Sequence, residues 1–438
     1  MKKASFHTLG CKLNYTETVT LSRRFRDRGY AIVGPHERPD VFVLNTCTVT
    51  ERADRECRQI IRRVLRNSPE TFVIVTGCYA QLNAREIASI GGVDLVLGSS
   101  EKFSAAELAG TLEKKPLPQI FVSCIDAEGD CAEAFSGEEG TRTRAFLKIQ
   151  DGCDYACAFC TIPLARGASR SLPMENILAA AVRLGDEGYR EVVLTGVNVG
   201  DYGRTSGVAL LDLLRRLDTV GSVERFRISS IEPNLLSDEL LRFILGSRRF
   251  VNHFHLPLQS GSREILRAMK RRYTRDHYGE LVGKIRSMDP RAGIGADVIV
   301  GFPGETPSRF GETVSFLERL PLSYLHVFTY SERENTVAAG MRNPVEPRER
   351  YHRSERLRGL GRRIRAAFNA GFVGETVDVL LENASAGGVT TGLTTNYIRV
   401  AVRDAADLVN RIVPVTVDGS SDDVCTGSLA LRPRAAVA

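Results

Sequence analysis

Residues 145–160 read AFLKIQDGCDYACAFC, a strand-like run followed by a C-x3-C-x2-C cluster. Cys153, Cys157 and Cys160 are three of only ten cysteines in the 438-residue chain. Composition alone would produce this spacing in about one such chain in two hundred, so the trio needs a chemical explanation. A disulfide scaffold, a zinc site and an iron–sulfur cluster are the three candidates.

The rest of the chain narrows these candidates. The first residues, MKKASFHTLGCKLN, lack the apolar core of a signal peptide, and no run of eighteen apolar residues follows, so we expect a cytoplasmic protein without a membrane partner. Thiols stay reduced in the cytoplasm, which argues against a disulfide scaffold. A structural zinc site has four protein ligands and no open position, and only a distant residue could supply the fourth ligand here. Three thiolates suit an iron–sulfur cluster with one open iron, the position that chemistry requires.

The trio follows the first of six predicted strand–helix units. Six units over roughly 190 residues are too few for a closed eight-fold barrel, so we predict a partial (βα)6 barrel. The trio then lies on a loop at the carboxyl end of the strands, where reactive sites of such folds gather. The predicted strands are AFLKIQDG, EVVLTGV, RFRISSIE, NHFHLPLQ, GIGADVIVG and YLHVFTYS.

An α/β unit precedes the barrel. Strand-like runs (SFHTL, DVFVLNT, TFVIVTG and DLVLGS) alternate with helical runs, which predicts a doubly wound parallel sheet. Cys11, Cys47 and Cys78 follow the first three of these strands, with separations of 36 and 31 residues. Since open α/β sheets place ligand sites at the carboxyl ends of adjacent strands, we predict that these cysteines meet in space. Three unrelated core cysteines are the alternative.

The sequence GCDYACAFCTIPLARG resembles the cluster loop of the radical S-adenosylmethionine (SAM) enzymes. The resemblance implies that Cys153, Cys157 and Cys160 bind a 4Fe–4S cluster, whose open iron holds the amino and carboxylate groups of SAM. LTGVNVGDYG (194–203) and ADVIVGFPGET (296–306) resemble the segments that contact the amino end and the adenine of SAM. The cofactor-binding residues that we expect are Phe159, Arg166, Gly196, Asn198, Glu232 and Gln259.

The stretches around the first trio, TLGCKLNYTET, NTCTVTERADR and GCYAQ, are similar to the amino-terminal domain of the methylthiotransferases. In that family three such cysteines bind an auxiliary 4Fe–4S cluster. The resemblance therefore implies two 4Fe–4S clusters and two SAM molecules per turnover. One SAM donates a methyl group to sulfur, and the other is cleaved reductively to a 5′-deoxyadenosyl radical that abstracts hydrogen from the substrate.

Two residues favour one branch of that family. Lys12 and Tyr79 stand where the isopentenyladenosine branch typically has Gln and Met, and the ribosomal-protein branch typically has Pro at the position of Lys12. The implied enzyme is a tRNA methylthiotransferase that converts N6-threonylcarbamoyladenosine beside the anticodon to its 2-methylthio derivative. That substrate bears a carboxylate, which suits a basic or hydrogen-bonding pocket. Lys12, Arg166 and Arg170 are the candidate donors.

The implied partners are tRNA, an electron donor such as flavodoxin or ferredoxin, and a source of sulfur. A methylthiotransferase for isopentenyladenosine or for a ribosomal protein is the alternative within the family. A zinc-containing RNA-binding protein and an iron–sulfur electron carrier are the alternatives from other classes. The formal net charge of +6 permits a nucleic-acid partner without requiring one.

Composition also changes along the chain. The segment 348–365 has eight arginines and two glutamates, which predicts a basic helix that contacts an RNA backbone. The tail has short β-like runs and resembles an RNA-binding TRAM domain, with Asn396, Tyr397 and Arg399 as candidate RNA contacts. We expect an amino-terminal domain (1–112), a linker (113–141), a radical SAM core (142–346), an Arg-rich helical segment (347–372) and a TRAM-like domain (373–438).

Overall fold

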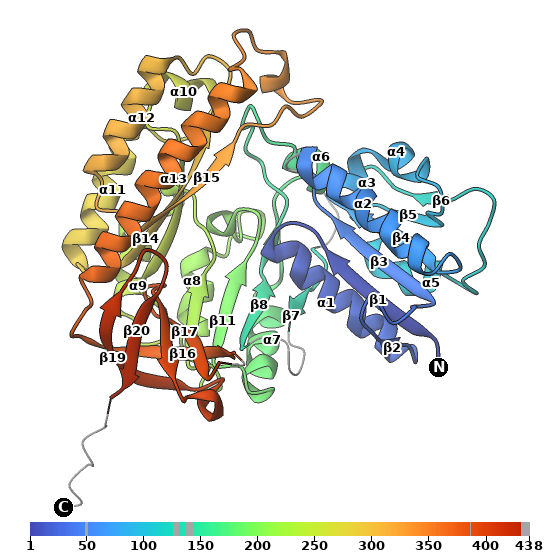
Figure 1. The fold of residues 1–438 in the computed structure, drawn as a ribbon, viewed down its shortest axis with the longest axis horizontal. Helices are drawn as coiled ribbons and strands as arrows, with labels where there is room; N and C mark the ends of the chain where they lie inside the picture. The colour runs from blue at the N-terminus through green and yellow to red at the C-terminus, as the bar shows by residue number, and fades with distance from the viewer. Residues whose placement is uncertain (49–50, 126–130, 137–142, 386, 431–438) are drawn as a thin grey trace, which may run out of the picture.

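The computed structural model describes residues 1–48, 51–125, 131–136, 143–385 and 387–430. An α/β unit, a half-barrel and a small closed β-barrel follow one another along the chain (Figure 1). In the part of the chain that is described, no helix has the length and apolar character needed to cross a membrane.

The amino-terminal unit contains a six-stranded parallel sheet in the order β2-β1-β3-β4-β5-β6. Helices cover both of its faces, as the predicted doubly wound sheet requires. Its strands are β1 (Lys3–Thr8), β2 (Ala31–Ile32), β3 (Val41–Thr46), β4 (Phe72–Gly77), β5 (Leu95–Leu97) and β6 (Gln119–Phe121). Its helices are α1 (Lys12–Asp27), α2 (Glu51–Asn67), α3 (Cys78–Leu82), α4 (Ala84–Ala88), the 3₁₀ turn η1 (Lys102–Ser104) and α5 (Ala105–Leu108).

The central strands β3 and β4 are apolar on both faces because each face packs against helices. Val41 and Val43 share one core with Leu21 of α1, whereas Phe42 shares another with Ile61 of α2. Continuous apolar runs are typical of parallel strands buried on both sides. The strands that the sequence predicts in this unit are therefore the centre of its sheet.

Six parallel strands form the half-barrel, in two sheets that meet where Phe226 and Phe250 make a parallel bridge. The predicted partial (βα)6 barrel is confirmed. Its strands are β8 (Arg144–Lys148), β11 (Glu191–Thr195), β12 (Arg225–Ile228), β13 (His253–Gln259), β14 (Gly293–Val300) and β15 (Tyr324–Thr329), with β7 (Phe135–Ser136) antiparallel at one edge and β9 (Gln150–Asp151) paired with β10 (Arg170–Ser171). Its helices are α6 (Ile162–Arg166), α7 (Met174–Asp186), α8 (Leu210–Leu217), α9 (Asp238–Gly246), α10 (Arg263–Ala268), α11 (Arg275–Met288) and α12 (Pro307–Arg319), with 3₁₀ turns η2 (Val199–Asp201), η3 (Pro233–Leu235) and η4 (Val337–Gly340).

The two faces of the half-barrel strands differ in polarity. Alternate residues such as Phe226 and Ile228 belong to the core beneath the outer helices. The residue between them, Arg227, is buried in an ion pair with Glu191 instead. Because successive side chains of a strand point to opposite faces, the concave face is lined by charged and polar groups. We call the space on this concave face the lumen.

The carboxyl-terminal part begins with the 24-residue helix α13 (Pro347–Ala370), which packs along β15. A closed five-stranded barrel in the order β16-β17-β18-β20-β19 follows and lies beneath the amino ends of the half-barrel strands (Figure 1). Its elements are β16 (Thr376–Ala384), β17 (Val389–Thr394), β18 (Arg399–Arg403), η5 (Ala406–Leu408), β19 (Ile412–Ser420) and β20 (Cys425–Leu429). The predicted fold class is thus confirmed in all three parts.

The amino-terminal unit docks against the open side of the half-barrel through α1 (Figure 1). Near the start of this helix the Tyr15 ring meets the Phe146 ring of β8 edge to face, with centroids 5.9 Å apart. The beginning of α1 therefore lies over the lumen.

Candidate active site

The Cys153–Cys160 loop lies at the carboxyl edge of the half-barrel, directly after β9. The Cys153 amide donates to the Gly167 carbonyl at 3.0 Å, and the Ala158 amide donates to the Met269 carbonyl at 3.0 Å. These bonds hold both ends of the loop against neighbouring elements. The three cysteines of the loop are half-buried and line one cavity of about 310 Å³.

The surroundings of these cysteines fit a cluster held by three thiolates. Burial raises the pKa of Cys153 to about 11 and that of Cys160 to about 12, and the charge of neighbouring thiolates adds to both shifts. Without a metal the thiols are therefore protonated at neutral pH, so cluster binding must displace protons. Arg271 donates to the Cys157 sulfur at 3.0 Å and places a positive charge beside the thiolates.

Two predicted SAM ligands have unpaired polar atoms. Asn198 is 4% exposed, and neither polar atom of its side-chain amide has a hydrogen-bond partner among the described residues. Gln259 has a left-handed φ of 67°, and its Oε1 is buried and also lacks a partner in that part of the chain. Buried polar atoms are normally hydrogen-bonded, so these two amides are suited to a ligand.

A second cavity, of about 350 Å³, lies between the cluster loop and the carboxyl ends of β13, β14 and β15. Phe159 and Gln259 line it together with Ile299 of the segment predicted to face adenine. Apolar walls with a few polar groups are typical of sites for small molecules. Phe159 is held by an edge contact with Phe302, with ring centroids 6.4 Å apart.

Gly196 and Glu232 both lie close to other residues of the half-barrel. A Cβ atom at Gly196 would lie 2.9 Å from Gln150 Oε1, so a larger residue would push the end of β11 away from β9. Glu232 forms an ion pair with Arg271, the residue that also binds Cys157. This ion pair ties the end of β12 to the cluster loop, and SAM contacts by Gly196 and Glu232 stay predictions.

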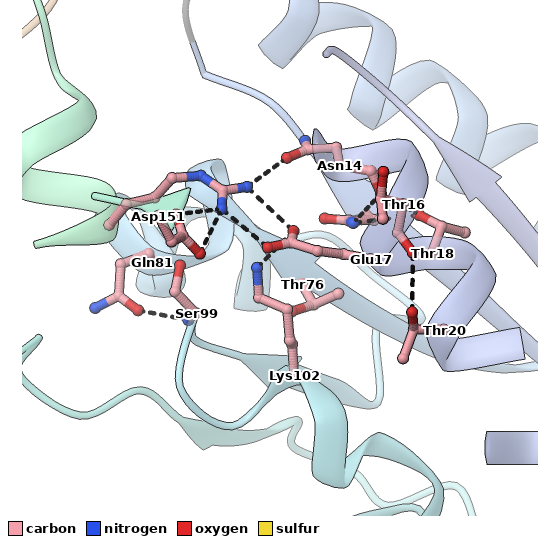
Figure 2. Close-up of polar contacts among 12 residues, drawn as sticks. Asn14, Thr16, Glu17, Thr18, Thr20, Thr76, Gln81, Ser99, Lys102 and Asp151 are labelled. Atoms are coloured by element: carbon pink, nitrogen blue, oxygen red, sulfur yellow. Dashed lines mark hydrogen bonds and ion pairs between the residues drawn. The ribbon is translucent and has the colours of Figure 1, made fainter. Parts of the chain in front are cut away.

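The structure corrects the predicted role of Arg166. Its guanidinium donates to Glu17 at 2.9 Å, to Asp151 at 2.9 Å and to Asn14 at 2.7 Å. Figure 2 labels these three partners. The residue is 2% exposed, and these partners engage both of its terminal nitrogens, so it has no terminal nitrogen left for a phosphate or for SAM. The motif LARGASRS could not reveal this, because two of the three partners lie about 150 residues away on α1.

Two lysines complete a buried ion network around Arg166. Lys102 reaches Glu17 at 2.8 Å, and Lys148 reaches Asp151 at 2.7 Å. Burial alone would raise the pKa of both carboxyl groups, but Arg166 and the two lysines hold each pKa well below its usual range. Three basic side chains and two ionised carboxylates thus meet at the contact between the amino-terminal unit and the half-barrel.

The first cysteine trio lies at the predicted edge of the amino-terminal sheet. Cys11, Cys47 and Cys78 follow β1, β3 and β4, which are adjacent in the sheet. A Cβ atom at Gly10 (φ 107°) would lie 2.5 Å from the Cβ of Cys47, and one at Gly77 (φ 99°) would lie 2.4 Å from the carbonyl oxygen preceding Cys47. Glycine before two of the cysteines therefore lets the three loops pack side by side, as three ligands of one cluster require.

Asn14 connects this trio to the ion network. Its Nδ2 donates to the carbonyls of Leu9 and Thr46, both at 2.9 Å, and thereby joins the loops that carry Cys11 and Cys47. Its Oδ1 accepts from Arg166, which binds Asp151, two residues before Cys153. These hydrogen bonds thus connect the loops that carry Cys11 and Cys47 to the strand that precedes the second trio.

Arg333 makes a second bridge that the sequence did not indicate. It lies after β15, lines the cavity beside Phe159 and donates to Asp54 of α2 at 2.6 Å and to Thr48. Arg271 was also missed, since it stands among the basic residues of KRRYTR, where nothing in the sequence distinguishes it. Both arginines are less exposed than the charged residues beside them, which a single sequence does not reveal.

Comparisons with known proteins agree with this geometry. Residues 3–98 match Uncharacterized protein family UPF0004, and residues 147–317 match the Radical SAM superfamily. The chain is 38% identical to threonylcarbamoyladenosine tRNA methylthiotransferase MtaB of Bacillus subtilis (strain 168), over 95% of this chain and 94% of that protein. The chain belongs to the MtaB family of threonylcarbamoyladenosine tRNA methylthiotransferases.

The prediction of family, enzyme class and substrate branch is confirmed. A tRNA-2-methylthio-N(6)-dimethylallyladenosine synthase of Alkaliphilus oremlandii (strain OhILAs) is less similar, at 32% identity over 88% of this chain and 83% of that protein. The fold is also found in the radical S-adenosylmethionine methyltransferase TsrM of Kitasatospora setae, with a TM-score of 0.56, 14% identity and 77% of each chain covered. The enzyme therefore uses an iron–sulfur cluster and SAM, and its substrate is a tRNA.

Proposed function

We propose that this tRNA methylthiotransferase holds two 4Fe–4S clusters and uses both at one substrate, N6-threonylcarbamoyladenosine. Cys153, Cys157 and Cys160 would hold one cluster, and Cys11, Cys47 and Cys78 the auxiliary one. The observation that carries the proposal is the hydrogen-bonded path from Asn14 through Arg166 to Asp151, because it holds the two cysteine trios in one fixed relation. When bound, the clusters and two SAM molecules supply the radical that removes hydrogen from C2 of the base and the methylthio group that replaces it.

The protein's own residues position these groups. Arg271 pairs with Glu232 and with Cys157, so it orients the cluster loop relative to the end of β12. Asn198 and Gln259 present unpaired amides for the polar groups of SAM. Arg333 joins the half-barrel to α2 of the amino-terminal unit beside the cavity that Phe159 lines. Preorganised polar groups of this kind need little rearrangement during the reaction.

The remaining requirements of the reaction come from outside the chain. Reductive cleavage of SAM needs a single-electron donor, and a flavodoxin or ferredoxin has the appropriate chemistry. The inserted sulfur needs a donor of its own. We propose that both meet the enzyme in the cytoplasm. We also propose the domain boundaries 1–112, 113–141, 142–346, 347–372 and 373–438, and the position of the linker between the two family matches supports them.

Iron analysis tests the proposal directly. After anaerobic reconstitution, about eight irons and eight sulfides per chain are expected from two cysteine trios. A variant with Ala at Cys11, Cys47 and Cys78 should keep about four of each. Four irons in the unmodified enzyme, with those three cysteines dispensable for methylthiolation, would contradict the two-cluster proposal.

A further inference from the structure

The floor of the lumen is closed by a loop of the carboxyl-terminal barrel. Residues 395–398, between β17 and β18, enter the amino end of the half-barrel. Arg227 of β12 donates to the carbonyls of Thr395 at 2.9 Å and Thr394 at 3.0 Å. Asn396 donates to the Arg291 carbonyl at 2.9 Å. Asn396 is thus used in packing, and the expectation that it contacts RNA is corrected.

Tyr397, at the tip of this loop, has an unusual backbone. Its φ of 73° is a left-handed value that a bulky residue adopts only when its surroundings enforce it. Its ring stacks on His253 with centroids 4.5 Å apart, and the guanidinium of Arg227 lies 5.2 Å from its centroid. These contacts hold the phenol group at the floor of the lumen.

Positive charge exceeds negative charge around this phenol. Glu191 pairs with Arg225 at 2.5 Å and with Arg227 at 2.8 Å, while Glu382 pairs with Arg144 at 2.5 Å. Three arginines therefore share two carboxylates. A buried excess of charge is costly unless a counter-charge approaches it, so the floor is suited to an anion.

Lys12 adds a further positive charge. It is the first residue of α1, one turn before Tyr15, whose contact with Phe146 places this end of the helix over the lumen. No described residue accepts a hydrogen bond or ion pair from its ammonium group, and solvent reaches the side chain.

The charges also act on Tyr397. Burial alone would raise the pKa of its phenol, but Lys12, Arg144 and Arg227 together lower it. A phenol in such a field is a good hydrogen-bond donor, and an unpaired ammonium group beside it is a good partner for a carboxylate. An apolar group in the same place would leave the lysine and the arginine excess without a counter-charge.

We propose that Lys12 and the phenol of Tyr397 bind the carboxylate of the substrate's N6 side chain and thereby select N6-threonylcarbamoyladenosine. The inference rests on the proposed function, since it needs the base to enter the lumen from the side of the two cysteine trios. Cys11 and Lys12 are consecutive residues. The same helix end would therefore hold the auxiliary cluster and recognise the substituent on the base that is modified.

The test uses reduced holoenzyme, SAM and anticodon stem-loops bearing either N6-threonylcarbamoyladenosine or its carboxamide, which lacks only the negative charge. The enzyme should bind and methylthiolate the acid with about tenfold or greater preference over the carboxamide. Lys12→Met should remove this preference, because it should weaken binding and methylthiolation of the acid alone. Lys12→Arg should restore part of the preference. Tyr397→Phe should reduce the preference to a smaller extent. Lys115→Met, an exposed lysine outside the lumen, should leave it unchanged.

Two measurements distinguish a failure of this inference from a failure of the proposed function. The dissociation constant of a labelled stem-loop reports the carboxylate site even without turnover, and product formation reports the function. If Lys12→Met weakens the binding of the acid and of the carboxamide stem-loop equally, the lysine contacts the RNA phosphates or supports the structure, and the inference is wrong. An enzyme that prefers the acid in binding but forms no methylthio product would support the site and contradict the proposed function.

Discussion

At the scale of single residues, the six proposed cluster ligands occupy two different environments. Cys153, Cys157 and Cys160 share one short loop that lines an open cavity, so a single loop can present an iron to SAM. Cys11, Cys47 and Cys78 come from three strand ends, and two of them are almost fully buried. This difference is consistent with different proposed roles for the two clusters, SAM cleavage at one and delivery of the methylthio group at the other.

Single cysteine substitutions test this division. Cys157→Ala should abolish reductive cleavage of SAM, because a cluster that lacks one ligand is not held against the cofactor. Cys47→Ala should retain cleavage and give no methylthio product. Both products are measured by chromatography and mass spectrometry, with Cys124→Ala, an exposed cysteine without an assigned role, as the control. Equal loss of SAM cleavage in both folded variants would show that the two clusters do not have these separate roles.

At the scale of secondary-structure elements, α13 has two different groups of arginines. Arg350 and Arg353 are buried and pair with Glu332 and Glu305. They fasten the helix to the end of the half-barrel. The others point to the outside: Arg348, Arg356, Arg358, Arg362 and Arg363 are exposed, and Arg365 is half-buried beside Asp423. Only this second group fits the predicted contact with an RNA backbone.

Salt dependence of tRNA binding checks that assignment. Replacing Arg356, Arg362 and Arg363 by Gln should weaken binding and reduce the slope of log Kd against log salt concentration by about 0.7 for each lost phosphate contact. The fold should be little affected, because these side chains are exposed and Arg356 contacts a buried ring, that of Phe310, only at 5.6 Å from its centroid. Arg242→Gln on the outer helix α9 is the matched control. An unchanged slope in the triple variant would remove α13 from the tRNA interface.

The sequence predicted most elements because each carries a local signal. Alternation of apolar runs with helical periodicity identified β1, β3, β4, β5 and the six half-barrel strands. Strands of two or three residues, such as β2 and β6, are too short to carry such a pattern. The sequence predicted that Cys11, Cys47 and Cys78 follow adjacent strands, because each comes directly after an apolar run. The sequence assigned Arg166 a wrong role and did not single out Arg271 or Arg333, because the partners of these arginines lie far away in the sequence.

At the scale of the whole molecule, the contact between the amino-terminal unit and the half-barrel is held by charge. Glu17 and Lys102 belong to the first of these, while Lys148, Asp151 and Arg166 belong to the second. Breaking a buried ion pair by removing one partner is far more costly than breaking an exposed one, because the remaining charge stays buried. The network therefore makes the stability of each unit dependent on the other unit.

Substitution of Arg166 tests this dependence. Arg166→Met should lower the free energy of unfolding by about 3–5 kcal/mol, since it leaves Glu17 and Asp151 with fewer cations. Chemical denaturation of the cluster-free protein measures the change, with Arg363→Met as an exposed control. A loss as small as that of the control would mean that the network contributes little to stability.

The same variant should change the acid sensitivity of the fold. The carboxyl groups of Glu17 and Asp151 have lowered pKa values when folded, so their stabilisation is complete above the ordinary carboxyl pKa of about 4 and is lost as the pH falls below it. Without Arg166 these pKa values rise toward the ordinary one. The acid unfolding midpoint, followed by circular dichroism, should therefore move to higher pH in Arg166→Met.

The first two turns of α1 combine three tasks in one rigid piece: Cys11 precedes it, Lys12 faces the lumen, and Asn14 and Glu17 hold Arg166. Shifting this helix to suit a new substrate would disturb both the proposed cluster ligand Cys11 and the contact between the two units. Replacing the side chain of Lys12 would disturb neither. If Lys12 selects the substrate as proposed, a designer who wishes to alter the preference should exchange this side chain and leave the backbone of α1 in place.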